Sequence, residues 1–193
     1  MADSVQKLEA LIRATLDRQR RVSAAVLRTI PAILPVRTTV WTDYRVSSRF
    51  GMRWHPLTGR WLHHAGIDLP QPTGASVYAT ADGRVSRLIR EPQGLGLAVT
   101  ITHASGFQTV YGHLSRQWVQ VGQSVKRGQP VGAVGSTGRA TGLHLHYTIL
   151  RRGKAGPRKA VDPTRFCFLL LDHLFLKPER PIFYQKEGRA GSQ

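Results

Sequence analysis

Residues 96–113, GLAVTITHASGFQTVYGH, decide the fold class of this 193-residue chain. Two runs rich in β-branched and aromatic residues flank a short turn signal, Ala-Ser-Gly at 104–106, and this pattern predicts a β-hairpin. Short β-branched runs punctuated by Gly and Asp continue on both sides of the hairpin, at residues 76–90, 118–135 and 143–152. We therefore expect a mainly β, compact antiparallel structure that spans residues 46–166.

The sequence patterns at the two ends of the chain differ from the β pattern of residues 46–166. Apolar residues recur every three or four positions up to Ile30, so residues 1–45 predict an amphipathic helix that ends at Pro31, followed by an extended linker. Such a helix either packs on its own domain or binds a protein partner. Asp162 and Pro163 are typical of a helix start, and residues 167–193 would hold the end of this short C-terminal helix and an irregular tail.

The amino-acid composition limits which classes of molecule this protein can bind. With 28 Lys and Arg against 11 Asp and Glu, the net charge is +17, which suits either a polyanionic partner or a basic solvated surface. No aromatic-rich RNA-binding motif or recognition helix is visible, so specific nucleic-acid binding is not expected. No stretch has the roughly 18 apolar residues of a transmembrane helix. The single cysteine, Cys167, excludes an internal disulfide and a multi-cysteine zinc site.

Histidines and one aspartate form the strongest chemical pattern. In a strand, His144 and His146 point to one face while Leu145 turns to the other. His64 and Asp68 lie four residues apart on a loop that bends at a glycine, so both can reach one ion. Two histidines and one carboxylate make an open zinc site that leaves a position for water.

Two further histidines bear on this site. His63 is a rival to His64, but the spacing to Asp68 favours His64. His113 follows Tyr111 and Gly112 at the end of a predicted strand, where it could accept a proton or stabilise an oxyanion.

Four ordered motifs resemble those of the lysostaphin-type, LytM-like zinc endopeptidases, which cleave peptide bonds in the stem or cross-bridge peptides of peptidoglycan. The motifs are SRFGMRWHP (48–56), HAGID (64–68), YGHL (111–114) and GSTGRATGLHLH (135–146), and a closing Asp-Pro pair stands at 162–163. The resemblance covers roughly residues 46–166, and four motifs in the same order make chance agreement very improbable.

The resemblance implies a role for each of five residues. His64, Asp68 and His146 would hold one Zn²⁺ per chain, and His113 and His144 would be the catalytic pair. A water activated by the zinc would attack the scissile carbonyl, with the two catalytic histidines as acid–base and oxyanion partners. The implied fold is a barrel-like antiparallel structure of the duplicated hybrid motif type.

The same resemblance places two arginines near the groove and shows two departures. Arg53 and Arg49 would bind substrate, with a stem-peptide carboxylate as the expected partner. Leu143 replaces the usual proline before the first histidine of the H-x-H pair. Thr148 replaces a usual acidic residue, and we expect this change to affect the strand and not the ligands.

Two functions compete at this point. The first is an active peptidoglycan endopeptidase; the alternative is a catalytically inactive LytM-like regulator that binds and activates cell-wall amidases. Inactive members lack several site residues, and all five are present here, which favours the enzyme. Peptidoglycan as partner implies the cell envelope, periplasmic or secreted, although residues 1–10 lack the pattern of a signal peptide.

Overall fold

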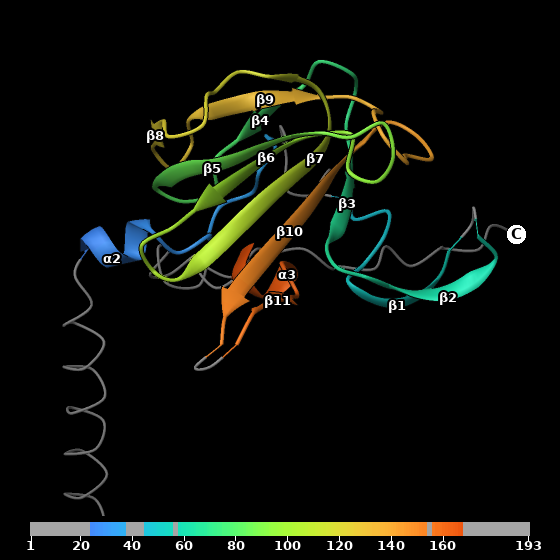
Figure 1. Cartoon of the computed structure of the whole chain (residues 1–193), viewed down its shortest axis with the longest axis horizontal. Coiled ribbons are helices and arrows are strands. Elements are labelled where there is room, and N and C mark those ends of the chain that lie inside the picture. Colours follow the sequence, from blue (N-terminus) through green and yellow to red (C-terminus); the bar gives the residue numbers. More distant parts are fainter. Residues whose placement is uncertain (1–23, 38–44, 56–57, 154–155, 168–193) are drawn as a thin grey trace, which may run out of the picture.

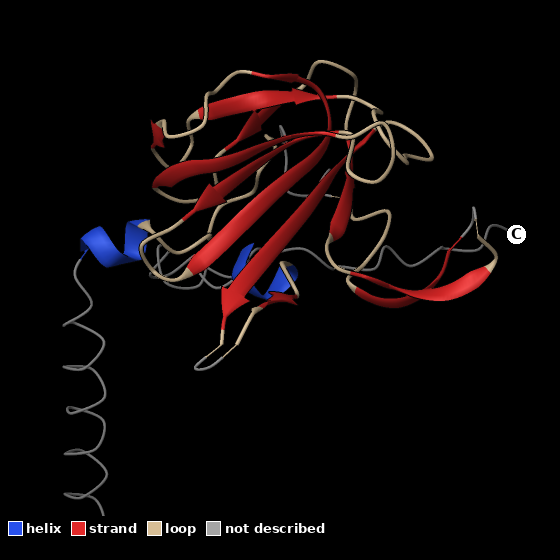
Figure 2. Cartoon of the chain, in the orientation of Figure 1, coloured by secondary structure: helices blue, strands red, loops and turns tan. Residues whose placement is uncertain are grey.

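The computed structural model describes residues 24–37, 45–55, 58–153 and 156–167. The predicted helix before Ala24 and the predicted tail after Cys167 lie outside these described residues. Within the described part of the chain, strands dominate and only two short helices occur (Figures 1 and 2). The prediction of a mainly β structure is therefore confirmed. No helix among these residues is long and apolar enough to cross a membrane.

The elements follow one another along the chain in a simple order. They are α2 (Ala24–Arg28), β1 (Gly51–His55), β2 (Arg60–His64), β3 (Ile67–Pro70), β4 (Ser76–Tyr78), β5 (Gly83–Arg90), β6 (Leu97–Thr102), β7 (Phe107–Gln117), β8 (Ser124–Val125), β9 (Pro130–Val134), β10 (His144–Arg152), β11 (Arg158–Val161) and α3 (Thr164–Cys167).

Nine of these strands form one antiparallel sheet with the order β11-β10-β7-β6-β5-β8. β3 joins it through β10, and β4 joins it through β9, which pairs with β7. The predicted hairpin over residues 96–113 appears as β6 and β7, joined by a turn at Gly106, where φ is +84°. Because β10 lies between β3 and β7, segments far apart in sequence meet along it.

The core lies where strand side chains alternate inward. Its fully buried members include Tyr111 on β7 and Tyr147 on β10, whose ring centroids are 5.4 Å apart. Their hydroxyls share a buried partner, because Thr80 Oγ1 lies 3.1 Å from Tyr111 Oη and 2.8 Å from Tyr147 Oη. A buried hydroxyl needs such a partner, so the tyrosines pack without leaving a polar atom unsatisfied.

The segment after α2 packs against the sheet. Ala32 and Val36 are 4% and 3% exposed, and the Ala32 N–H donates to the Thr80 carbonyl over 3.2 Å. Tyr78 N–H donates to the Pro35 carbonyl over 2.8 Å, and Val36 forms an isolated bridge with Val77. Residues 32–36 therefore pack along an edge of the β-domain.

Two pairs of strands in the structure were not predicted from the sequence. β1 and β2 form a separate two-stranded hairpin that projects beside β3 (Figure 1). β11 pairs with β10, although it is short and carries Arg158 and Lys159. At the C-terminal end, Asp162 Oδ1 accepts from Thr164 N–H over 3.0 Å, so Asp162 caps α3 as predicted.

His103 is a buried histidine far from the predicted metal motifs. It is 2% exposed; its Nδ1 lies 2.8 Å from the Asp82 carbonyl and its Nε2 2.9 Å from Thr109 Oγ1. Burial lowers the pKa of His103 below its usual value of 6.5, and the hydrogen bond to Asp82 only partly opposes this. The folded protein therefore favours the neutral ring.

We expect this histidine to make the fold acid-sensitive. Below about pH 6.5 the unfolded chain takes up the proton more readily than the folded one, so the free energy of unfolding falls as the pH falls. We expect the free energy of unfolding, measured with urea, to fall less between pH 7.5 and pH 5 in His103→Gln than in the parent protein. An equal fall in the free energy of unfolding in both proteins would contradict the role of His103 in acid sensitivity.

Candidate metal centre and catalytic site

Three elements bring the predicted ligands together. His64 ends β2, Asp68 lies in β3, and His146 lies in β10, where it pairs directly with Asp68 in the antiparallel register. Asp68 Oδ1 is 2.9 Å from His146 Nδ1 and 3.2 Å from His64 Nε2, and these two nitrogens are 3.1 Å apart. All three side chains are buried or nearly so, at 7–12% exposure.

The outer nitrogens of both histidines have partners of their own. His64 Nδ1 donates to the Arg49 carbonyl over 2.9 Å, because a carbonyl can only accept, and its Nε2 faces Asp68. His146 Nε2 lies 3.0 Å from Thr148 Oγ1, which holds Nδ1 toward the same point. Thr148 therefore contacts a predicted ligand, so the expectation that it affects only the strand was wrong.

This donor set fits a zinc ion. In a tetrahedral site with bonds of about 2.0–2.1 Å, neighbouring ligand atoms lie about 3.3 Å apart, close to the 2.9–3.2 Å observed here. Burial alone would raise the pKa of Asp68, but hydrogen bonds to His146 and His64 outweigh it and hold that pKa well below its usual value. A buried carboxylate flanked by two imidazoles is thus available as an anionic ligand.

Gly66 permits the close approach of these segments. A Cβ at this position would lie 2.4 Å from the Tyr147 carbonyl oxygen and 3.0 Å from His146 Cε1. The first separation is shorter than real Cβ atoms show and the second is tighter than most, so only glycine lets the loop between His64 and Asp68 pass over β10. The H-x-G-x-D spacing therefore has a steric reason.

The predicted catalytic pair stands beside the three ligands. His113 Nδ1 donates to the Thr137 carbonyl over 2.8 Å, and His144 Nδ1 donates to the Gly142 carbonyl over 2.9 Å. In each neutral ring, Nε2 is then left as a proton acceptor. The ring centroids are 4.8 Å apart, and His144 Nε2 lies 3.6 Å from Asp68 Oδ1.

His113 has an unusual backbone. Its φ is +59°, the only positive value among the described residues other than glycine, and it lies where the register between β6 and β7 shifts. Backbone of this kind is costly and concentrates at functional sites. Burial, followed by the nearby charges of His144 and His146, lowers the pKa of His113 to about 4, so the ring is neutral at pH 7.

All five residues line one open pocket of about 270 Å³. Arg53 also lines it and lies 3.7 Å from Asp68 Oδ2. The Arg49 side chain is exposed and is not among the lining residues, although its carbonyl orients His64. Arg139, which the motifs did not single out, also lines the pocket. Its backbone N–H donates to the Gly94 carbonyl over 2.8 Å and joins the two loops there.

His63, the rival to His64, does not join the three ligands. Its ring packs edge-on against Phe50, with the centroids 4.9 Å apart. Successive residues of a strand point to opposite faces, so only one of the two histidines can turn toward Asp68.

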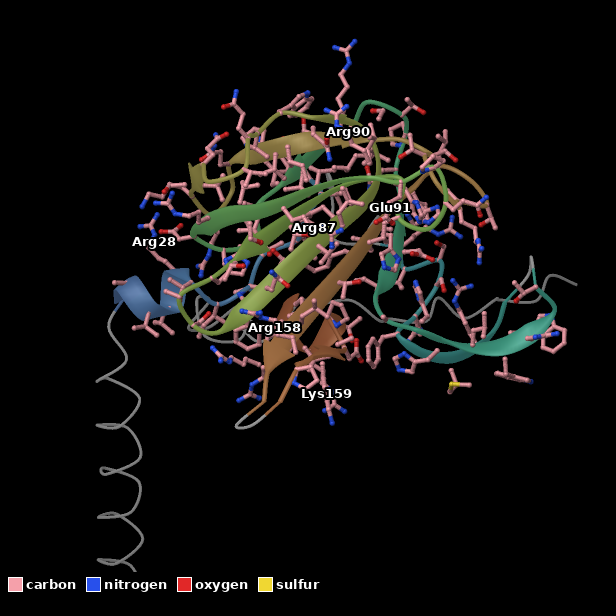
Figure 3. All side chains as sticks on the ribbon, viewed as in Figure 1. Arg28, Arg87, Arg90, Glu91, Arg158 and Lys159 are labelled. Carbon is pink, nitrogen blue, oxygen red and sulfur yellow. The ribbon has the colours of Figure 1, made fainter. Side chains whose placement is uncertain are left out.

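The sheet surface is strongly basic. Arg87 and Arg90 project from β5, and Arg158 and Lys159 project from β11 near the other edge of the sheet (Figure 3). Glu91 is a nearby acid, with its Oε1 4.0 Å from the Arg87 guanidinium. This distribution suits long-range attraction to an anionic polymer.

Comparisons with known proteins identify a peptidase family. Residues 62–163 match the model of peptidase family M23. The chain is 48% identical over 121 residues to the DD-carboxypeptidase/endopeptidase Mpg of Neisseria meningitidis, covering 62% of this chain and 28% of that protein. It is 43% identical over 119 residues to the peptidoglycan DD-endopeptidase ShyA of Vibrio cholerae, covering 61% and 27%. The chain thus spans little more than a quarter of either relative.

Solved structures show the same relationship. A zinc-containing peptidase from Vibrio cholerae has 40% identity and a TM-score of 0.59, covering 67% of this chain and 38% of that one. The catalytic domain of lysostaphin from Staphylococcus simulans has 28% identity and a TM-score of 0.57, covering 65% and 92%. The predicted resemblance and fold are thereby confirmed. The chain belongs to peptidase family M23.

Proposed function

We propose that this chain is a zinc-dependent endopeptidase that hydrolyses peptide bonds in the stem or cross-bridge peptides of peptidoglycan. One observation carries the proposal: His64, Asp68 and His146 converge within hydrogen-bonding distance, and His113 and His144 face the same pocket. The names of the relatives agree, since ShyA is a peptidoglycan DD-endopeptidase and a solved neighbour is a zinc-containing peptidase.

In the proposed hydrolysis, a bound zinc ion and the side chains of this protein would have different roles. Zinc held by two histidines and one carboxylate supplies Lewis acidity, which polarises a carbonyl oxygen and acidifies water. His113 and His144 each offer Nε2 as an acceptor, so one can take the proton of the attacking water and return it to the leaving amine. The other, once protonated, can donate to the oxyanion that develops on the substrate.

The pocket walls support a peptide substrate that carries carboxylates. Arg53, from β1, and Arg139, from the loop before β10, both line the pocket, and a guanidinium binds a carboxylate through paired hydrogen bonds. Arg53 is thus the better placed of the two arginines proposed for substrate binding. Peptidoglycan as the partner, together with the basic sheet surface, supports a place of action in the cell envelope.

The alternative of an inactive regulator is not favoured. Such a protein would need no ordered metal-ligand set, yet three buried ligands and two oriented histidines are all present. Buried polar side chains lower the stability of the fold unless they form hydrogen bonds or bind a metal. A buried cluster of this kind therefore favours a functional metal site over an inactive one.

Digestion of a defined substrate tests the proposal. We expect the zinc-loaded protein to convert purified cross-linked muropeptide dimers to monomers, as measured by liquid chromatography and mass spectrometry. Chelator-treated protein should be inactive and should recover when zinc is restored. Intact dimers of every cross-link chemistry after prolonged incubation with the zinc-loaded protein would contradict an endopeptidase.

Thr148 provides a separate prediction about metal affinity. Partners of metal-bound histidines fix the ring and raise its basicity, and losing one costs about 10–100-fold in affinity. We expect Thr148→Val to raise the zinc dissociation constant by about that factor, because it removes the hydroxyl beside His146 Nε2. Competition with a chromophoric chelator measures the constant directly.

Thr148→Ser is the matched control for this prediction. It keeps a hydroxyl on the same strand position, so its zinc affinity should stay within about threefold of the parent. Equal zinc affinity in the Val variant and the parent would show that the contact does not act on the metal site.

A further inference from the structure

The β1–β2 hairpin presents two chemically different faces. Arg53 and Leu62 pair across the strands on the face that lines the metal pocket. Trp54 and Trp61 pair directly on the opposite face, and Met52 lies two residues before Trp54 on that face. Alternation along each strand produces this division, so one hairpin serves both as pocket wall and as an outer apolar surface.

The outer face is unusually exposed. Trp54, Trp61 and Met52 are 57%, 64% and 61% exposed. The two indoles meet edge to face, with ring centroids 6.4 Å apart and an interplanar angle of 79°. Trp54 also rests near the turn, where a Cβ on Gly59 would lie 3.7 Å from its ring. Three large side chains gathered in this way form a patch, and patches of this kind mark interaction sites.

The position of the patch indicates its occupant. His63 pairs with Met52 on this outer face and also lines the pocket, so the patch borders the pocket. A peptidoglycan peptide held in the pocket would remain attached to a glycan strand, and a patch that borders the pocket is a surface that the attached sugars would meet. The C–H face of a pyranose ring packs well on the electron-rich face of an indole, as other ring contacts do.

We propose that Trp54 and Trp61 form a platform that binds the glycan strand of peptidoglycan while the attached peptide occupies the pocket. This inference rests on the proposed function for its substrate class. Two rigid rings order few rotatable bonds on binding, which makes them efficient contacts for a polymer. The platform would give preference to cross-links that still carry sugar over free peptides.

Paired substrates test the platform. One is a cross-linked muropeptide dimer with its disaccharides, and the other is the same dimer after removal of the sugars. For Trp54→Ala and Trp61→Ala we expect kcat/KM on the sugar-bearing dimer to fall about tenfold, mainly through KM, since a lost stacking contact is worth about one decade of affinity. Rates on the sugar-free dimer should stay within about twofold of the parent.

Trp118→Ala is the matched control. Trp118 is 45% exposed and lies outside both the hairpin and the pocket lining, so this variant should behave like the parent on both dimers. Equal losses on the two dimers in the hairpin variants would overturn the platform, because they would show a general effect on the pocket.

A binding measurement separates this inference from the proposed function. Calorimetric titration with peptide-free glycan strands requires no cleavage, and we expect weaker binding after Trp54→Ala and Trp61→Ala. Unchanged glycan binding in these variants would overturn the platform even if the enzyme cleaves dimers. Loss of binding to anionic phospholipid vesicles with unchanged glycan binding would also overturn it and would assign the patch to a membrane surface.

Discussion

Replacing Asp68 with Ala is expected to abolish both metal binding and hydrolysis. Asp68 is the anionic member of the three-residue cluster, and its Oδ1 contacts both His64 and His146 within 3.2 Å. Without it, two neutral imidazoles remain, which hold a divalent ion far more weakly. We expect less than about a tenth of an equivalent of zinc by mass spectrometry, and peptide hydrolysis reduced by at least about a thousandfold.

Glu91→Ala is the control for loss of an acidic residue. Its side chain is 52% exposed and outside the pocket lining, so zinc content and hydrolysis should match the parent protein. A folded Asp68→Ala variant that still carries one equivalent of zinc would contradict the ligand assignment. Far-ultraviolet circular dichroism establishes the folded state of each variant.

Replacing His113 or His144 with Ala is expected to abolish hydrolysis while zinc remains bound. Neither histidine belongs to the cluster of three ligand atoms, and each donates Nδ1–H to a backbone carbonyl. Loss of a positioned acid–base group costs about 10²–10⁴-fold in rate. We expect kcat to fall by that factor in each variant, with zinc content close to one equivalent, and the double variant to lose little more.

The zinc content of a His146 variant distinguishes the proposed roles of His144 and His146. His146→Ala should lose the metal, although His146 lies only two residues from His144 on the same strand. If His144→Ala lost the zinc and His146→Ala retained it, the roles within the H-x-H pair would be reversed. Metal analysis of both variants, purified in parallel, decides between the two assignments.

The sequence indicated which side chains of the candidate site would come together, but little of what surrounds them. The H-x-H pair is readable because β-strands alternate with a period of two, and the structure buries Leu145 completely between the two histidines. The H-x-G-x-D motif is readable because only glycine fits over β10 at Gly66. Local rules of this kind act over a few residues, so they survive in a sequence read without its fold.

Other features depended on which segments meet in space. The β1–β2 hairpin escaped notice because its tryptophans are exposed, whereas strand patterns are recognised by burial. Arg53 reaches the pocket only because β1 pairs with β2, which places Arg53 opposite Leu62 on the pocket side of the hairpin. The segment 32–36 reads as a linker, yet its backbone hydrogen-bonds to the strand that ends at Tyr78 and to Thr80.

The sequence by itself determined the β class of this chain and indicated the side chains that we propose as metal ligands and as the catalytic pair. Those properties follow from residue type and from spacing along one strand or loop. The tertiary structure alone decided the left-handed backbone of His113, the pairing of His146 with Asp68 and the two faces of the hairpin. These depend on strand register between distant segments, because a shift of one residue would turn every side chain to the other face.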